Sequence, residues 1–350
     1  MIRFSKPRYR KAGFKLALMA TLLAALVLLL GVFTRLTDAG LGCPDWPSCY
    51  GHTFWPGSPE EIAEAERRFP GTKFEPGKAW LEMLHRYAAA LLGLMAVALA
   101  VISWRRRERE DYPFRLPTLI LFLLVWQAFF GMWSVTLKLL PQVVTFHLVA
   151  GMTTFSLLWL LALRLGSRPW QLGEVAERQL ARFKPWLVVL LGALLLQIAL
   201  GGWTSANYAA FACGDFPTCQ GQWWPEMDFK NGFDFTQEVS PSYLGGKLET
   251  EARVAIHVTH RLVGLVLAVL TFIIAGALLW VKNNQVRVLA MTLVMLMAVE
   301  LLLGLANNLL MAPMLTALLH HLFSALLLLV LVALMTGIWT AKPEYQRRES

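Results

Sequence analysis

The sequence predicts an all-α polytopic membrane protein with eight transmembrane helices arranged as two tandemly repeated four-helix bundles. Three observations predict this fold class. Hydrophobic residues make up 57% of the chain and charged residues only 16%, with a mean hydropathy of +0.52; soluble domains are about 45–50% apolar and about 25% charged. Eight apolar runs are long enough to cross a bilayer, and the second half of the chain repeats motifs of the first.

Each predicted span holds roughly 20 apolar residues, the length that a tilted helix needs to cross the hydrocarbon core. In chain order the spans cover 16–36, 80–104, 116–137, 142–163, 186–206, 253–281, 287–310 and 314–339. The first span follows a basic segment, but its apolar run exceeds that of a secretory signal and no small-residue cleavage site follows it. We expect this span to stay in the protein as a signal anchor.

The distribution of charge predicts the orientation of the spans. With the N-terminus inside, the inner segments carry a net charge of +14 and the outer segments −6. Inner segments of membrane proteins are enriched in Lys and Arg. We therefore expect a bacterial inner-membrane protein with both termini in the cytoplasm and two large periplasmic loops, 38–79 and 207–253. The overall charge of +9 reflects this orientation, and no nucleic-acid partner is expected.

An internal repeat with an offset of about 170 to 175 residues divides the chain into halves 1–170 and 171–350. The matched positions are Gly31 with Gly201, Cys43 and Cys49 with Cys213 and Cys219, His85-Arg86 with His260-Arg261, Gln127 and Gly131 with Glu300 and Gly304, and His147 with His320 or its neighbour His321. Four spans are an even number of crossings, so both halves have the same orientation. We expect them to pack about an axis along the membrane normal.

Each half places one histidine on its second span and one on its fourth. His85, His147, His260 and His320 lie about 5 to 7 residues inside the outer ends of their spans, roughly 8–10 Å deep. A lone histidine on a helix is more often structural than a ligand, but two per half at equal depth match the two axial positions of a six-coordinate haem. Zinc would need two further ligands per site, and only one candidate carboxylate is present.

Glu82 lies three residues before His85 and therefore shares its helix face. A buried acid beside a metallocofactor is a candidate proton donor or acceptor. The alternative is an interfacial glutamate in salt contact with Arg35 or Arg86. The repeat places His257 at the position equivalent to Glu82, so we expect the two halves to do different jobs.

Three arginines lie near the same outer ends, namely Arg35, Arg86 and Arg261. They could pair with haem propionates, because a guanidinium group binds a carboxylate through two hydrogen bonds. The alternative is that they anchor their helices by extending toward the membrane surface.

All four cysteines lie in the two outer loops, in two pairs of identical spacing. In an oxidising periplasm each pair, Cys43 with Cys49 and Cys213 with Cys219, can close a local disulfide. The disulfides could be structural or redox-active, and the sequence leaves both readings open.

Together these motifs resemble the heme A synthase family, over nearly the whole chain and all eight spans. The resemblance rests on Thr34-Arg-Leu-Thr-Asp-Ala-Gly-Leu41, Glu82-Met-Leu-His-Arg86, Gln197-Ile-Ala-Leu-Gly-Gly-Trp-Thr204, the Cys213–Cys219 loop and His257-Val-Thr-His-Arg261. It implies a b-type haem on His260 and His320, haem O on His85 and His147, and a catalytic role for Glu82. It also implies that Cys43 and Cys49 are the family's cysteine pair and that Cys213 and Cys219 are a second pair found only in some members. The doublet His320-His321 departs from the family pattern, and we prefer His320.

The resemblance implies oxidation of a haem O methyl group to a formyl group, through two hydroxylations and loss of water, to give haem A for terminal oxidases. Expected partners are the lipid bilayer, the farnesyltransferase that makes haem O and an electron donor; a homo-oligomer stays open. Two alternatives are a di-haem cytochrome b-like electron-transfer protein and a quinone-linked thiol oxidoreductase. The first does not explain why Glu82 has His257 as its equivalent, and the second needs no buried histidines.

Overall fold

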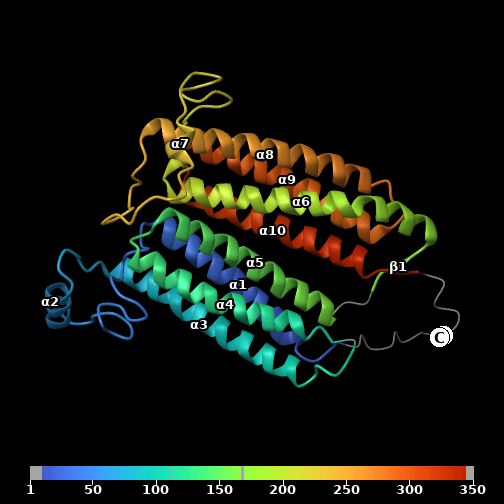
Figure 1. The fold of residues 1–350 in the computed structure, drawn as a ribbon, viewed down its shortest axis with the longest axis horizontal. Helices are drawn as coiled ribbons and strands as arrows, with labels where there is room; N and C mark the ends of the chain where they lie inside the picture. Colours follow the sequence, from blue (N-terminus) through green and yellow to red (C-terminus); the bar gives the residue numbers. More distant parts are fainter. Residues whose placement is uncertain (1–9, 111, 167–168, 344–350) are drawn as a thin grey trace.

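The structure, a computed structural model, describes residues 10–110, 112–166 and 169–343. Within these ranges eight helices are long and apolar enough to span a membrane, and they lie side by side (Figure 1). In chain order they are α1 (Phe14–Leu36), α3 (Pro76–Trp104), α4 (Arg115–Thr136), α5 (Pro141–Gly166), α6 (Glu174–Ala206), α8 (Thr250–Leu278), α9 (Asn284–Leu309) and α10 (Met314–Trp339). The eight predicted spans are confirmed.

The fifth span shows the largest difference from its predicted bounds. Its apolar run begins at residue 186, whereas α6 begins at Glu174 and contains Pro185. Glu174 and Glu177 lie in the first turn of α6, where acidic side chains interact favourably with the helix dipole. Hydropathy does not detect this polar extension, because it identifies only residues suited to the bilayer.

The helices pack in two groups of four that meet along one seam. Contacts join α1, α3, α4 and α5 to one another, and likewise α6, α8, α9 and α10; α5 packs on α6 and α10, and α1 packs on α10 (Figure 1). Across the seam, the indole nitrogen of Trp159 on α5 donates a hydrogen bond to the Leu329 carbonyl on α10 (3.1 Å). This packing is consistent with the predicted tandem bundles.

The backbone repeats the same irregular conformations in both halves. The turn from α4 to α5 has positive φ at Lys138 and Leu139, and the turn from α9 to α10 has it at Met311 and Ala312. Such values are uncommon for residues other than glycine. Their recurrence 173 residues apart supports the internal repeat, because the same short turn connects equivalent helices.

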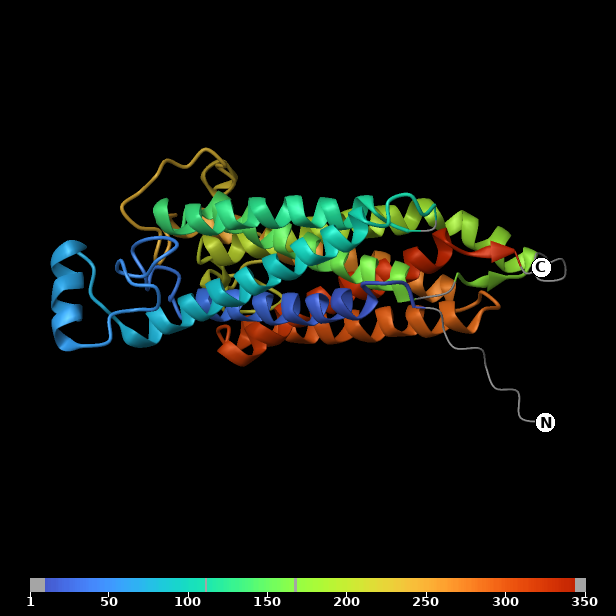
Figure 2. The same ribbon diagram turned by 90° about the horizontal axis from the view of Figure 1, so that it is seen from below.

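Both large loops lie at one end of the helices (Figures 1 and 2). The first contains α2 (Pro59–Arg68), which projects beyond the bundle, and the second contains η1 (Ala209–Phe211) and α7 (Phe229–Gly232). At the opposite end β1 (Gln171–Leu172) pairs in parallel with β2 (Lys342–Pro343). Placement of both loops at one end agrees with the predicted even number of crossings per half.

Candidate functional site

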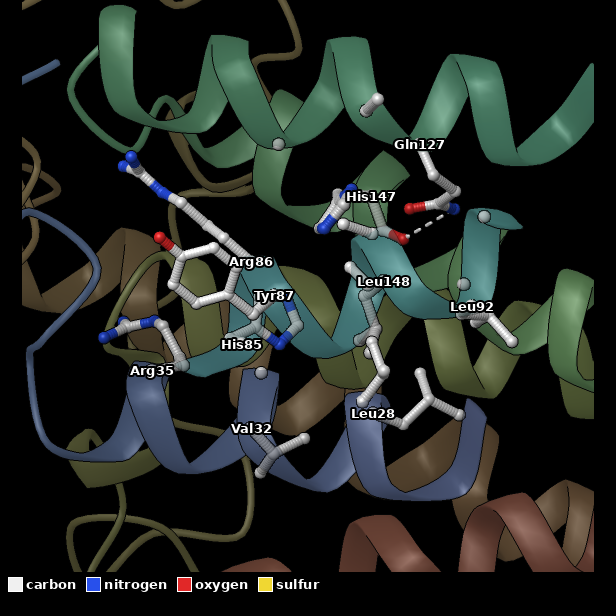
Figure 3. Close-up of a pocket in the computed structure, with 18 of the residues that line it drawn as sticks. Leu28, Val32, Arg35, His85, Arg86, Tyr87, Leu92, Gln127, His147 and Leu148 are labelled. Carbon is white, nitrogen blue, oxygen red and sulfur yellow. Dashed lines mark hydrogen bonds between the residues drawn. The ribbon is translucent and has the colours of Figure 1, made fainter. Parts of the chain in front are cut away.

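A cavity of about 760 Å³ lies among α1, α3, α4 and α5. Most of its lining is apolar, with Leu28, Leu92 and Leu148 among the contributing side chains. Figure 3 shows His85 of α3 and His147 of α5 directed into the same space. The structure therefore brings together the two histidines predicted for the first half, inside a pocket large enough for a bulky apolar ligand.

The imidazoles of this cavity lack protein partners at one nitrogen. Nδ1 of His85 and Nδ1 of His147 are buried and form no hydrogen bond with any described residue. Gln127 donates instead to the backbone carbonyl of His147 (3.2 Å). Because these Nδ1 atoms are inaccessible, a group bound in the cavity would be held through the other ring nitrogen, Nε2.

In the second half, α8 and α10 bring His260 and His320 together. Their ring centroids lie 6.5 Å apart and their planes are 80° apart. Two imidazole nitrogens on opposite sides of one metal ion, each at about 2 Å, would place the ring centres roughly 6 Å apart. The pair thus fits a single metal ion between its rings.

Polar side chains flank both rings of this second pair. The Gln197 amide donates to the His260 carbonyl (3.1 Å) and lies 3.1 Å from its Nδ1. A carboxylate oxygen of Glu300 lies 3.3 Å from Nδ1 of His320 and accepts a hydrogen bond from Ser324. Groups of this kind orient the rings of ligating histidines, and sequence reasoning matched Glu300 with Gln127 without giving it this role.

The doublet His320-His321 is divided between the two halves. His320 faces His260, whereas His321 lines the cavity of the first half together with Gly202 and Ser205 of α6. Sequence reasoning missed this contribution. Adjacent residues of a helix point about 100° apart, which could have indicated that the two rings face different surroundings.

Glu82 is buried and directed toward the first outer loop. Its carboxylate accepts a hydrogen bond from the Cys43 backbone N–H (2.9 Å) and pairs with Arg86. His85 and Arg86 line the cavity, but Glu82 is not among the described residues that do. Its equivalent, His257, donates instead from Nδ1 to the Ala209 carbonyl (2.9 Å).

Arg86 and Arg261 hold the two large loops in the same way. Arg86 donates to the carbonyls of Asp45 (2.9 Å), Pro47 (3.2 Å) and Ser48 (2.7 Å). Arg261 donates to those of Cys213 (3.3 Å), Asp215 (2.9 Å) and Thr218 (2.9 Å), and also to the Asn308 side chain. Each arginine therefore connects its histidine-bearing helix to the loop above.

Arg35 has different partners and joins the two halves. It donates to the Ser205 carbonyl (2.5 Å), pairs with Asp38 (3.2 Å) and stacks on the Tyr208 ring at 4.0 Å. Arg35 and Arg86 line the outer end of the cavity (Figure 3). Arg261 contributes nothing to this cavity among the described lining residues.

Both predicted disulfides are present, Cys43–Cys49 and Cys213–Cys219. Inside the second ring Asp215 accepts hydrogen bonds from the Thr218 hydroxyl and the backbone N–H groups of Gln220 and Gly221. These bonds, led by the one from Thr218, lower the pKa of Asp215 below its usual 3.8.

In the described part of the chain, eight helices able to span a membrane, two disulfide-closed loops and two pairs of buried histidines define a polytopic membrane protein with an internal repeat. The chain belongs to the cytochrome oxidase assembly protein family, whose sequence model matches residues 14–332. A relative named heme A synthase from Shewanella oneidensis is 41% identical over 314 residues, which cover 90% of this chain and 93% of the relative.

More distant relatives carry the same name. The heme A synthase of Wolbachia pipientis subsp. Culex pipiens is 27% identical over 317 residues, covering 85% of this chain and 89% of its own. That of Caulobacter vibrioides is 26% identical over 349 residues, covering 93% and 95%. The similarity therefore extends through both halves.

Proposed function

We propose that this protein is a heme A synthase, an oxidoreductase that converts a methyl group of haem O to a formyl group by successive hydroxylations. The observation that carries the proposal is the apolar cavity with His85 and His147 directed into it. The name shared by relatives that cover most of the chain supports the same activity. The product would be haem A for terminal oxidases.

In the proposed assignment, the first half binds the substrate. His85 and His147 would hold haem O, since both rings are directed into the same apolar cavity. The apolar lining suits a porphyrin face and a farnesyl chain. Arg35 and Arg86 at the outer end could also receive the propionates.

The second half would hold a b-type haem between His260 and His320. The 6.5 Å separation of the ring centroids and the flanking Gln197 and Glu300 support this assignment. A haem bound there supplies one-electron chemistry. The chain's own contribution is to fix the two rings and exclude water from them.

Glu82 is the proposed catalytic acid–base group, and its carboxylate would accept and release the proton. Its hydrogen bond from Cys43 and ion pair with Arg86 fix the carboxylate between the α3 helix and the first loop. His85 lies one turn away on the same helix. In the second half the position equivalent to Glu82 is His257, which has no carboxylate. This difference supports catalysis in the first half only.

The proposal is tested by expressing the protein with an enzyme that produces haem O and separating the extracted haems by chromatography. We expect haem A and its hydroxymethyl intermediate to appear. Bound haem with neither product would contradict the synthase and favour a di-haem electron-transfer protein. Substitution of all four cysteines addresses a thiol oxidoreductase, because only that activity requires the disulfides as reactants.

A further inference from the structure

Each of the four paired histidine rings lies against a glycine of a neighbouring helix. A Cβ atom built on the glycine would lie close to Cε1 of the ring: 3.0 Å for Gly31 with His85, 3.8 Å for Gly131 with His147, 3.4 Å for Gly201 with His260, and 3.3 Å for Gly304 with His320. The helices that carry these glycines are α1, α4, α6 and α9. The same relationship thus occurs four times.

The internal repeat shows that this arrangement belongs to both halves. Gly31 is matched by Gly201, and Gly131 by Gly304. Glycine in a helix interior is less favourable than alanine because it loses more backbone freedom on folding. The free energy that each helix loses by having glycine beside a paired histidine must therefore be offset by another interaction.

Packing against the glycines restricts the orientation of the rings. Nδ1 of His85 and of His147 is buried without a hydrogen bond to any described residue, so hydrogen bonding does not fix these two rings. In the second half Gln197 and Glu300 lie 3.1 Å and 3.3 Å from Nδ1 of His260 and His320, and the glycines act beside these polar contacts. A methyl group added at 3.0 Å, beside His85, or at 3.3 Å, beside His320, would require the ring to move by a few tenths of an ångström; at 3.4 Å, beside His260, the contact is at the limit of this tight range. At 3.8 Å, beside His147, the same methyl would make an ordinary van der Waals contact.

We propose that Gly31, Gly201 and Gly304 are positioning residues that set the orientation of the histidine rings toward the haem, an inference that rests on the proposed function. By lacking a side chain, each glycine allows its helix to approach the edge of the imidazole. An alanine there turns or tilts the ring, which alters the electronic structure of a haem bound to it. Gly131, with more room, does not have this role.

The second half provides the direct test, on purified protein carrying its bound haem. Gly201→Ala and Gly304→Ala are each compared with Gly192→Ala, a substitution on α6 with open space around it. We expect the first two to shift the low-field electron paramagnetic resonance signal of the oxidised haem and its midpoint potential, or to lose the haem. Gly192→Ala keeps the wild-type signal and haem content.

A purely structural role for these glycines gives a different result. Alanine favours a helix more than glycine does, so a structural role would leave the spectrum unchanged. Unchanged spectra in both Gly201→Ala and Gly304→Ala would overturn the inference. Absence of haem from the wild-type second half would instead refute the proposed function, so the two failures are distinguishable. If one variant does not fold, the other tests the same point.

The first half supplies a graded version of the test, read out by titrating haem O into protein and following its absorbance. Gly31→Ala, the tightest position, should weaken binding by roughly tenfold. Gly131→Ala, whose added methyl only reaches van der Waals contact with its ring, should lose less affinity than Gly31→Ala, and Gly192→Ala, away from the cavity, should bind haem O as the wild type does. Equal affinities of wild type and Gly31→Ala, or a larger loss in Gly131→Ala than in Gly31→Ala, would contradict the inference.

Discussion

The Glu82 carboxylate joins the transmembrane helix α3 to the first outer loop. It accepts a hydrogen bond from the Cys43 backbone and pairs with Arg86, which also holds three carbonyls of the same loop. Any change at this carboxylate therefore affects the loop and the helix together. A useful substitution has to keep the shape of the side chain.

Glu82→Gln keeps that shape but removes the proton-transferring group. We expect bound haem to persist and conversion of haem O to fall by about 100-fold or more, the usual contribution of a general acid or base. Chromatography of extracted haems measures the conversion. Glu75→Gln, which changes a surface acid at the start of the same helix, is the control and should convert normally. Normal conversion by Glu82→Gln would show that its role lies elsewhere.

The divided histidine doublet gives a second prediction for single residues. His260→Ala and His320→Leu should lose the proposed b-type haem, since each removes one of the two facing rings. His321→Leu should retain it, because His321 lines the cavity of the first half. Reduced-minus-oxidised absorbance spectra distinguish these outcomes. If His320→Leu retained the haem and His321→Leu lost it, the ligand would be His321 and not His320.

Residue types and depths in the sequence were enough to predict the histidine pairs and the disulfides. The sequence did not predict the direction of each side chain, because a helical pattern defines only the broad face on which a residue lies. Thus Glu82, expected beside the cofactor, is turned toward Cys43. Arg86 and Arg261, considered as propionate partners, donate to loop carbonyls far away in the sequence.

At the scale of elements, each disulfide loop is organised around one aspartate. Asp45 accepts hydrogen bonds from Ser48, Tyr50 and Gly51 in the first loop, as Asp215 does from equivalent groups in the second. The lowered pKa of Asp215 means that its ionised carboxylate stabilises the second loop. The second loop should therefore respond to acid in a defined direction.

Reduction of Cys213–Cys219 by a phosphine, which is active at acid pH, should show this response. The folded pKa of Asp215 is lowered, so its contribution is complete above the unfolded value and is lost as pH falls through the lower folded value. We expect the ratio of the wild-type rate to the Asp215→Asn rate, in which protonation of the phosphine cancels, to be constant from pH 7 to about pH 4 and to rise toward one below. Asp215→Asn should react faster throughout, without the acid step. A rate in this variant equal to the wild type would contradict the prediction.

Element lengths were predictable where the bilayer determines them. The last span was predicted at 314–339 and observed as Met314–Trp339, whereas the polar start of α6 was missed. The short pairing of β1 with β2 has no signal in the sequence. Two residues from each of two distant segments pair there because the helices bring these segments together.

At the scale of the whole molecule, the orientation in the membrane can be tested by chemical labelling. The native cysteines are disulfide-bonded, so an introduced cysteine is the reactive one. Lys230→Cys in the second outer loop should react with a membrane-impermeant maleimide in intact spheroplasts. Lys282→Cys, between α8 and α9, should react only after lysis. The reverse pattern would invert the topology predicted from charge.

The division of the neighbouring residues His320 and His321 between two sites has a mechanical consequence for α10. Each residue advances the helix by about 100°, so rotating α10 to adjust one ring would turn the other by the same angle. The rotation of α10 is thus constrained from two sides, because His320 must face His260 and His321 must face the cavity of the first half. A rotation of α10 that changes the orientation of His320 therefore also changes the orientation of His321.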